Sequence, residues 1–192
     1  MGHAPTPPPP GDDELVTAAR AGDGGAFAAL VERHHGPLLR YLWRRTGDRE
    51  LAADLAQDAF LDAFRHLDRL PLGRPFAPWL YRIAQNRLAR AGRRARRRRA
   101  VSLEALPGPE GAAIPALQLP DGSGPTQERD LVQRALDGLS PGQREALLLH
   151  ALLGFPAREV AAILGISTAA AQRRIGRATQ RFRARYEALA EG

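Results

Sequence analysis

The spacing of apolar residues predicts helices along nearly the whole chain from residue 12 onward. In the first half, four helices are expected, over residues 12–21, 26–46, 48–67 and 75–99. Pro37 is expected to kink the second helix or to split it. The four helices form one predicted domain over residues 12–99, so the sequence favours an all-α fold.

The predicted helix over residues 48–67 has two different faces. Its apolar stripe, expected in the core, comprises Leu51, Leu55, Ala59, Phe60, Ala63, Phe64 and Leu67. On another face Asp54, Asp58 and Asp62 repeat at every fourth residue, with Gln57 beside them. Like charges at this spacing destabilise an isolated helix by a few tenths of a kcal/mol per pair, which suggests a basic partner surface that offsets the cost. An ordinary solvated acidic face is the alternative.

The predicted helix over residues 75–99 is strongly basic. Its apolar stripe comprises Leu80, Ala84, Leu88 and Ala91. One other face carries an aromatic ring, an amide and a row of guanidinium groups: Trp79, Arg82, Asn86, Arg90, Arg93 and Arg97. Such a face can stack a base, hydrogen-bond it and follow phosphates. For Trp79, burial in the core is the favoured interpretation. For the arginines, nucleic acid is favoured over a soluble helix end, because so dense a charge repels itself without a counter-ion.

Residues 100–125 break the helical pattern. They contain nine Pro or Gly residues, only acidic charges and no sustained periodicity, which predicts a flexible linker. Residues 1–11 are proline-rich and are predicted to be disordered. A second small helical domain is expected over residues 126–192, beginning with a helix at about 126–137.

The second domain has the pattern of a helix-turn-helix within residues 139–186. Ser140 and Gln143 form a capping box at the start of one helix, and Gly165 and Ser167 form a tight turn into another. The buried side of that last helix is expected to comprise Ala171, Ile175, Ala178 and Phe182. The same helix carries six arginines and no acid between them: Arg173, Arg174, Arg177, Arg181, Arg183 and Arg185. DNA contact is favoured over a solvated basic surface, because the charges lie on the helix that such a motif inserts into DNA.

The distribution of charge agrees with this interpretation. All 28 basic residues are arginine, and the formal net charge is +7. Residues 87–99 hold eight arginines and residues 173–185 hold six, while the remainder has 14 arginines against 21 acids. Two separate cationic patches on a mildly acidic body fit a nucleic-acid binder.

Several classes of function are disfavoured by composition. The chain has no cysteine, so disulfides and thiolate metal sites are excluded. The five histidines lack metal-ligand spacing, and without lysine there is no phosphate-binding Gly-rich loop with its Lys. The N-terminus lacks the apolar core of a signal peptide, and no apolar run is long enough to span a bilayer. We therefore expect a cytoplasmic protein, not inserted in a membrane, with no metal, no cofactor and no enzymatic activity.

Taken in order, four segments resemble the extracytoplasmic-function sigma factors, a compact two-domain class of bacterial transcription initiation factors. They are DLAQDAFLDAF at 54–64, FAPWLYRIAQN at 76–86, the arginine run that follows, and the region from Leu139 onward. The resemblance covers nearly the whole chain from Asp13 to Tyr186. It implies a factor that binds core RNA polymerase and directs it to promoters by recognising −10 and −35 elements, with an inhibitory anti-sigma partner. The alternative is a free-standing helix-turn-helix regulator that binds operator DNA without polymerase.

The resemblance also implies roles for individual residues. Core polymerase would be bound by Asp54, Gln57, Asp58 and Asp62. The −10 element would be contacted by Trp79, Arg82, Asn86, Arg90, Arg93 and Arg97. The −35 element would be contacted by Ser167, Thr168, Gln172, Arg173, Arg174 and Arg177.

Three short segments differ from the family pattern. An Asp commonly follows the Asn by four residues, whereas Arg90 occupies that position here. The recognition segment usually reads S-x-G-T-V-K-S-R, but residues 167–174 are STAAAQRR. The short helix begins with Pro-Ala-Arg at 156–158 in place of the common Tyr-Glu-Glu. These differences leave the architecture intact and bear on the promoter sequence.

Overall fold

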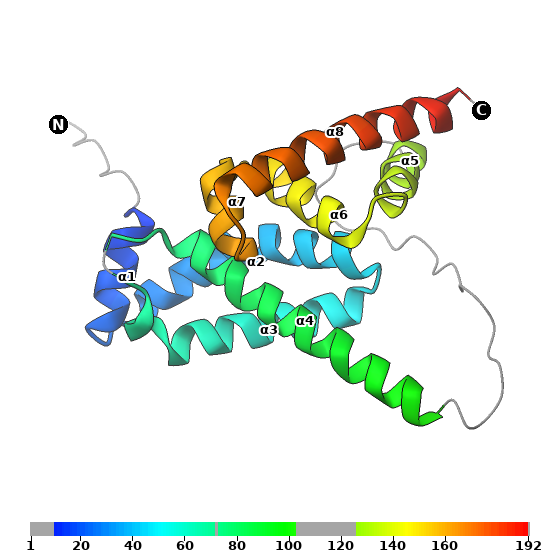
Figure 1. The fold of residues 1–192 in the computed structure, drawn as a ribbon. Coiled ribbons are helices and arrows are strands. Elements are labelled where there is room, and N and C mark those ends of the chain that lie inside the picture. The colour runs from blue at the N-terminus through cyan, green and yellow to red at the C-terminus, as the bar shows by residue number, and fades with distance from the viewer. Residues whose placement is uncertain (1–9, 72, 103–125, 192) are drawn as a thin grey trace.

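The computed structural model describes residues 10–71, 73–102 and 126–191 (Figure 1). Within these ranges the chain forms helices joined by short turns and no β-strand, so the predicted all-α fold is confirmed. The helices fall into the two groups that the sequence predicts, one before residue 103 and one after residue 125.

The first group contains four α-helices and one short 3-10 helix. They are α1 (Asp12–Arg20), α2 (Gly24–Thr46), α3 (Arg49–Arg65), η1 (Leu67–Arg69) and α4 (Phe76–Ser102). Two aspartates cap these helices: Asp23 Oδ1 accepts from Gly25 N–H at 2.8 Å, and Asp48 Oδ1 accepts from Leu51 N–H at 3.0 Å. Such caps satisfy backbone donors that a helix leaves free in its first turn, which is why the helices begin where they do.

Pro37 does not divide α2, which runs unbroken from Gly24 to Thr46 with the proline inside it. The split considered from the sequence is therefore wrong. A proline removes one backbone hydrogen bond from a helix. The buried side chains of Leu38, Tyr41 and Leu42 follow it directly and anchor the second half of α2 in the core.

The predicted boundaries of the linker need one correction. Helix α4 continues to Ser102, so residues 100–102 are helical although they were assigned to the linker. The rest of the predicted linker lies outside the described residues, as does most of the predicted disordered segment at 1–11. Of that segment residues 10 and 11 are described, and Gly11 is the N-cap of α1.

The second group forms the predicted helix-turn-helix domain. Its elements are α5 (Thr126–Asp137), α6 (Pro141–Leu147), the π-helical turn η2 (Leu148–Leu152), α7 (Ala157–Leu164) and α8 (Thr168–Ala190). Gln143 Oε1 accepts from Ser140 N–H at 3.2 Å at the start of α6. Gly165 ends α7 with φ of 65°, and Ser167 Oγ accepts from Ala170 N–H at 3.2 Å at the start of α8. Gly165 and Ser167, from which the sequence predicts a tight turn, thus do form the turn between α7 and α8.

The apolar stripe of α3 differs from the prediction at its two edges. Leu55, Ala59 and Ala63 are buried, but Leu51 is 36% exposed and Phe64 is 59% exposed. Phe64 instead makes an edge contact with Phe27 of α2, with ring centroids 5.0 Å apart. Successive residues are rotated by about 100° on a helix, so both side chains lie roughly 100° or more from the centre of the buried face.

The two groups of helices pack against each other. Helix α7 contacts α4, and η2 contacts α2, while α8 runs across the top of the view with α6 and α7 beneath it (Figure 1). Tyr81 of α4 joins the two halves: its ring makes an edge contact with Tyr41 at 5.3 Å and with Phe155, just before α7, at 5.2 Å. The buried apolar residues of both domains therefore form one continuous core.

The polar groups between the two domains are incompletely paired. Arg45 lies 3.6 Å from Glu145 and donates to the carbonyl of Pro141 at 3.3 Å. The hydroxyls of Tyr41 and Tyr81, whose rings lie near this contact, are buried without a hydrogen-bond partner among the described residues. A buried polar group that makes no hydrogen bond is costly, so this contact is less favourable than its aromatic rings alone would make it.

Candidate nucleic-acid and polymerase interface

The predicted polymerase-binding residues occupy the solvent side and one flank of α3. Asp54 and Gln57 are exposed. Asp58 and Asp62 are half-buried because they lie on the flank that faces α4. The row of acids is therefore divided, with the N-terminal member open to solvent and the two others held against a neighbouring helix.

Arg87 of α4 holds both of those flanking acids. Its Nη1 donates to Asp58 Oδ2 at 2.9 Å, its Nε donates to Asp62 Oδ2 at 2.6 Å, and its Nη2 pairs with Asp62 Oδ1. The hydrogen bonds from Arg87 lower the pKa of the Asp62 carboxyl, and the same bonds raise the pKa of the guanidinium. A two-point contact of this kind fixes the direction of both side chains as well as their charge state.

The predicted −10 face lies along the outer side of α4. Arg82, Asn86, Arg90 and Arg93 are exposed, and the side chain of Arg97 lies outside the described part of the chain. At the start of the helix, Trp79 is half-buried and its ring lies 6.0 Å from that of buried Phe76. Trp79 therefore packs against the core with one side and remains partly accessible, between the two interpretations considered from the sequence.

The second domain leaves this face of α4 free. One contact of α4 with the second domain is made by Tyr81, which packs on Phe155. Asn86 lies about 140° around the helix from Tyr81, because five steps of roughly 100° separate them. Tyr81 and Asn86 thus lie on different sides of one helix, and Arg82, Asn86, Arg90 and Arg93 remain exposed.

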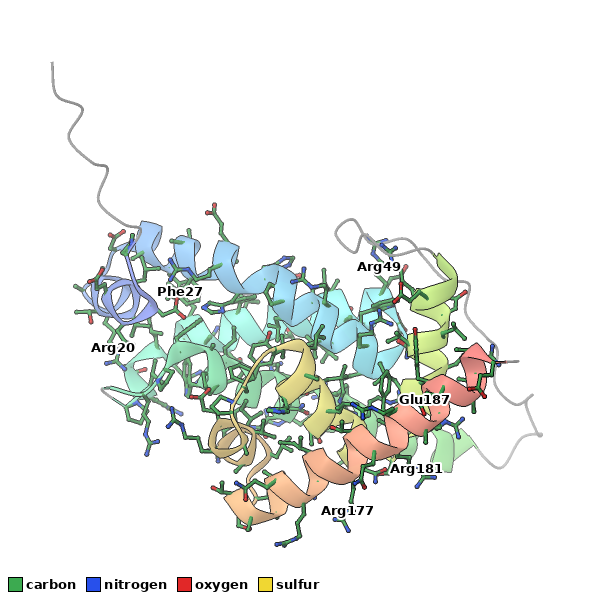
Figure 2. The ribbon with its side chains drawn as sticks, turned by 90° about the horizontal axis from the view of Figure 1, so that it is seen from above. Arg20, Phe27, Arg49, Arg177, Arg181 and Glu187 are labelled. Atoms are coloured by element: carbon green, nitrogen blue, oxygen red, sulfur yellow. The ribbon has the colours of Figure 1, made fainter. Side chains whose placement is uncertain are left out.

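The predicted −35 face is at the start of α8. Ser167, Thr168, Gln172, Arg173 and Arg177 are exposed. Figure 2 shows Arg177 and, one turn later, Arg181 on the side of α8 that faces away from the other helices. Among the described side chains, no carboxylate lies within ion-pair distance of any of the exposed arginines at 173, 177 and 181. Exposed guanidinium groups without a carboxylate nearby can bind phosphates and guanine edges.

Arg174 differs from its neighbours. It is half-buried and lies over α6, where a β-carbon added to Gly142 would be 3.3 Å from its Nη1. Arg185 lies still closer to Gly138, where a β-carbon would be 1.8 Å from its Nε. Both side chains lie against a glycine elsewhere in the second domain, where a larger residue would collide with them. Arg174 is therefore less accessible to DNA than Arg173 or Arg177.

Other kinds of site find no support in the described residues. No group of three or more His, Cys, Asp or Glu side chains among them could hold a metal ion. No helix in these same ranges combines the length and apolar character needed to cross a membrane. The arrangement offers exposed cations on two helices and partly paired acids on a third, which is suited to binding polyanions and a basic protein surface.

Arg87 is not among the site residues that the sequence predicts. It immediately follows Asn86, so it lies off the face on which the other candidates were grouped. The signal that could have found it is the pair Asp58 and Asp62, because two acids four residues apart on one helix can share a guanidinium from a neighbouring helix.

Comparisons with known proteins agree with this geometry. Residues 30–98 match the family model of Sigma-70 region 2, and residues 129–182 match that of Sigma-70, region 4. The chain is 36% identical to RNA polymerase sigma factor CarQ of Myxococcus xanthus over 164 residues, which span 85% of this chain and 91% of CarQ. It is also 36% identical to ECF RNA polymerase sigma factor SigD of Mycobacterium tuberculosis over 181 residues, which span 88% of this chain and 81% of SigD.

A solved structure shows a similar arrangement of helices. The sigma factor RpoE from Bartonella quintana, in complex with the anti-sigma factor NepR, is similar with a TM-score of 0.71 and 27% sequence identity. The similarity covers 84% of this chain and 96% of that chain. The likeness therefore extends over both helical domains and does not stop at one motif.

Proposed function

The chain belongs to the extracytoplasmic-function RNA polymerase sigma factors, and from this membership we propose which of its surfaces performs each step of promoter recognition. The protein is a transcription initiation factor that directs RNA polymerase to promoters, and it catalyses no reaction itself. This membership sets aside the free-standing helix-turn-helix regulator that the sequence left as an alternative.

The N-terminal part of α8, up to Arg177, recognises the −35 element as duplex DNA. Gln172, Arg173 and Arg177 contact base edges, with Ser167 and Thr168 at the phosphates beside them. The exposure of these side chains and the placement of α8 after a tight turn support this role. Arg174 contributes only if it leaves Gly142, so we rank it below its neighbours.

The outer face of α4 recognises the −10 element. A base taken out of the stack would be hydrogen-bonded by Asn86, while Arg82, Arg90 and Arg93 follow the phosphates, as would Arg97. Trp79 is placed to border the unstacked base with its accessible side. Unstacking a base is costly, so only a sequence that repays the cost is opened, and this makes the step selective.

The acidic side of α3 binds core polymerase. Asp54 and Gln57 are open to solvent, and Asp58 and Asp62 adjoin them. The exposed carboxylate of Asp54, with the partly accessible Asp58 beside it, suits a basic partner surface and speeds encounter with it.

We further infer an anti-sigma partner and a cytoplasmic location. The anti-sigma inference rests on RpoE, which was solved in complex with the anti-sigma factor NepR and resembles this chain over both domains. The location follows from the function, because promoter DNA and RNA polymerase of a bacterium are in its cytoplasm.

The observation that carries the proposal is the pair of separate helices whose arginines are exposed. Its test is a reconstituted transcription assay with core polymerase and a promoter found by mapping transcript starts after overexpression. Arg173→Ala and Arg177→Ala should each reduce transcript yield, while Arg134→Ala, an exposed arginine on α5, should leave it at the wild-type level. Wild-type yield from both α8 variants would remove the assigned −35 role.

Core binding is tested separately. Asp54→Arg should reduce the amount of core polymerase that the purified protein retains, without loss of helical content. A gel shift on duplex promoter DNA should require core polymerase. Tight binding of duplex by the protein alone would contradict the proposal that its DNA-binding faces act only in the polymerase complex.

A further inference from the structure

Arg87 is the one described side chain that ties α4 to α3 by hydrogen bonds. It donates from three nitrogens to the carboxylates of Asp58 and Asp62, at 2.9 Å and 2.6 Å for the two longer contacts. Its side chain is 26% exposed and that of Asp62 is 21% exposed. The contact is therefore partly shielded from water, and we call it the Arg87 bridge.

The position of the bridge along α4 gives it a geometric consequence. Arg87 is the residue directly after Asn86, and the two side chains leave the helix about 100° apart. Because the bridge directs Arg87 toward α3, it also determines which way Asn86 points. Beyond this point Leu88 and Ala91 are only partly buried, and Arg90 and Arg93 are exposed.

The fully buried side chains of α4 lie earlier in the helix. Phe76, Leu80 and Ala84 are fully buried, and they anchor its first two turns. Apolar contacts resist separation of helices but tolerate small rotations, since they have no preferred direction. A guanidinium that engages two carboxylates from one side does have a direction. Among the described side chains, the bridge is thus the directional polar restraint between α4 and α3 at the level of Asn86.

The bridge also lies between two surfaces with different proposed partners. Asp58 and Asp62 belong to the row assigned to core polymerase, and Asn86 belongs to the face assigned to the −10 element. An isolated exposed ion pair contributes little to stability. The bridge therefore acts through its direction, and the loss of discrimination expected without it is modest.

We propose that Arg87 is a positioning residue for promoter recognition: it fixes the rotation of α4 on α3, so that polymerase-bound α3 presents Asn86 to the −10 element in a single orientation. The proposal rests on the functions proposed above for α3 and α4. In this proposal Arg87 acts through Asn86 and is assigned no contact of its own with DNA or polymerase.

The test measures discrimination between sequences as well as binding strength. Holoenzyme is assembled from the full chain and saturating core polymerase. Two fluorescent single-stranded non-template oligonucleotides are bound to it, one with the −10 sequence of a mapped promoter and one with that sequence permuted. The measured quantity is the ratio of the two affinities. A variant that is merely less stable lowers the active fraction for both oligonucleotides and leaves the ratio unchanged.

Arg87→Ala should lower the ratio by about fivefold, the low end of what one mismatched base pair costs a specific complex. Arg87→Lys should give an intermediate loss, because lysine keeps the charge but lacks the two-point geometry. Arg69→Ala, an exposed arginine on η1, is the matched control and should keep the wild-type ratio. If Arg87→Ala loses its helical content, Arg87→Lys alone carries the test.

Asn86→Ala separates the two levels of the proposal. If Asn86→Ala lowers the ratio and both Arg87 variants keep it at the wild-type value, the positioning role of Arg87 is overturned while the role of α4 stands. If none of these variants changes the ratio, the −10 role of α4 itself is wrong, and the positioning role is lost with it.

Discussion

Replacing Tyr81 by phenylalanine should stabilise the protein. The ring of Tyr81 is 2% exposed and makes edge contacts with Tyr41 and Phe155, and phenylalanine preserves both contacts. The hydroxyl, in contrast, is buried and has no hydrogen-bond partner among the described residues. Folding therefore removes its hydrogen bonds to water and supplies nothing in exchange.

The size of the effect follows from that imbalance. An unsatisfied buried polar group costs about 1–3 kcal/mol. Removing the hydroxyl recovers this cost, but the small void that the oxygen leaves offsets part of the recovery. We therefore expect a net increase in the free energy of unfolding of about 1 kcal/mol. For a chain of this length that corresponds to a rise in melting temperature of about 2–4 °C.

The assay is urea unfolding followed by circular dichroism, in which Tyr81→Phe should raise the midpoint without changing the slope. Burial also raises the pKa of Tyr81, so the folded state keeps the hydroxyl neutral above pH 10.0, where an unfolded tyrosine ionises. The hydroxyl therefore costs further stability as the pH rises past this value, and phenylalanine should abolish that part of the alkaline loss.

Two further variants frame the Tyr81→Phe result. Tyr186→Phe removes a hydroxyl from a half-exposed ring of α8 and should leave the midpoint unchanged. Tyr81→Ala removes the ring as well and should cost about 3–5 kcal/mol. A lower midpoint for Tyr81→Phe would mean that the hydroxyl makes a favourable hydrogen bond, and the reasoning from its burial would be refuted.

Three other substitutions test separate features of the structure. Gly165→Ala should destabilise the second domain by about 1 kcal/mol in urea unfolding, because the backbone at this position has a positive φ of 65°. The control is Gly92→Ala, at a helical position of α4 where an added β-carbon meets no other atom, and this variant should be neutral or stabilising. Asp62→Asn should lower stability at neutral pH by about 0.5–1 kcal/mol. Arg87 lowers the pKa of Asp62, so the stabilisation from this ion pair is present above pH 3.8, the ordinary carboxyl pKa, and is lost as the pH falls through the lower pKa of the folded state. Equal thermal stability of Asp62→Asn and wild type at neutral pH would contradict this prediction. Arg177→Ala should weaken binding of −35 duplex by the holoenzyme by about 1–3 kcal/mol if it contacts a base, with specificity relaxed at one position; a uniform loss across sequences with a shallower salt dependence would make it a phosphate contact.

Much of the fold could be predicted because its helix ends carry their own signals. The capping residues Asp48, Ser140 and Ser167 each begin a helix at the expected place, and Gly165 adopts the left-handed conformation that ends α7. These are local interactions between residues three or four apart, so a sequence displays them directly.

The contact between the two domains could not be predicted in the same way. Periodicity indicates which side of a helix is buried but not which other helix covers it. Tyr41, Tyr81 and Phe155 come from three distant segments, and the rings meet only in the folded chain. Phe64 shows a second limit of periodicity: it follows Phe60 by one turn, so its burial is predicted, yet it is 59% exposed.

The candidate site was predicted as surfaces rather than as contacts. The exposure of Arg82, Asn86, Arg173 and Arg177 agrees with the faces expected from helical spacing. The positions of Arg87 and Arg174 depend on neighbours that lie on other helices, α3 and α6, and spacing along one helix does not reveal them.

The contact between Tyr81 and Phe155 has a consequence for how the molecule meets its promoter. It leaves the outer faces of α4 and α8 uncovered, so it does not hide the arginines on them. Together with the rest of the packing between the two domains, it holds those faces at one interval. Under the proposed roles of α4 and α8, a promoter whose two elements lie at another interval would be engaged at both ends only after these rings have parted.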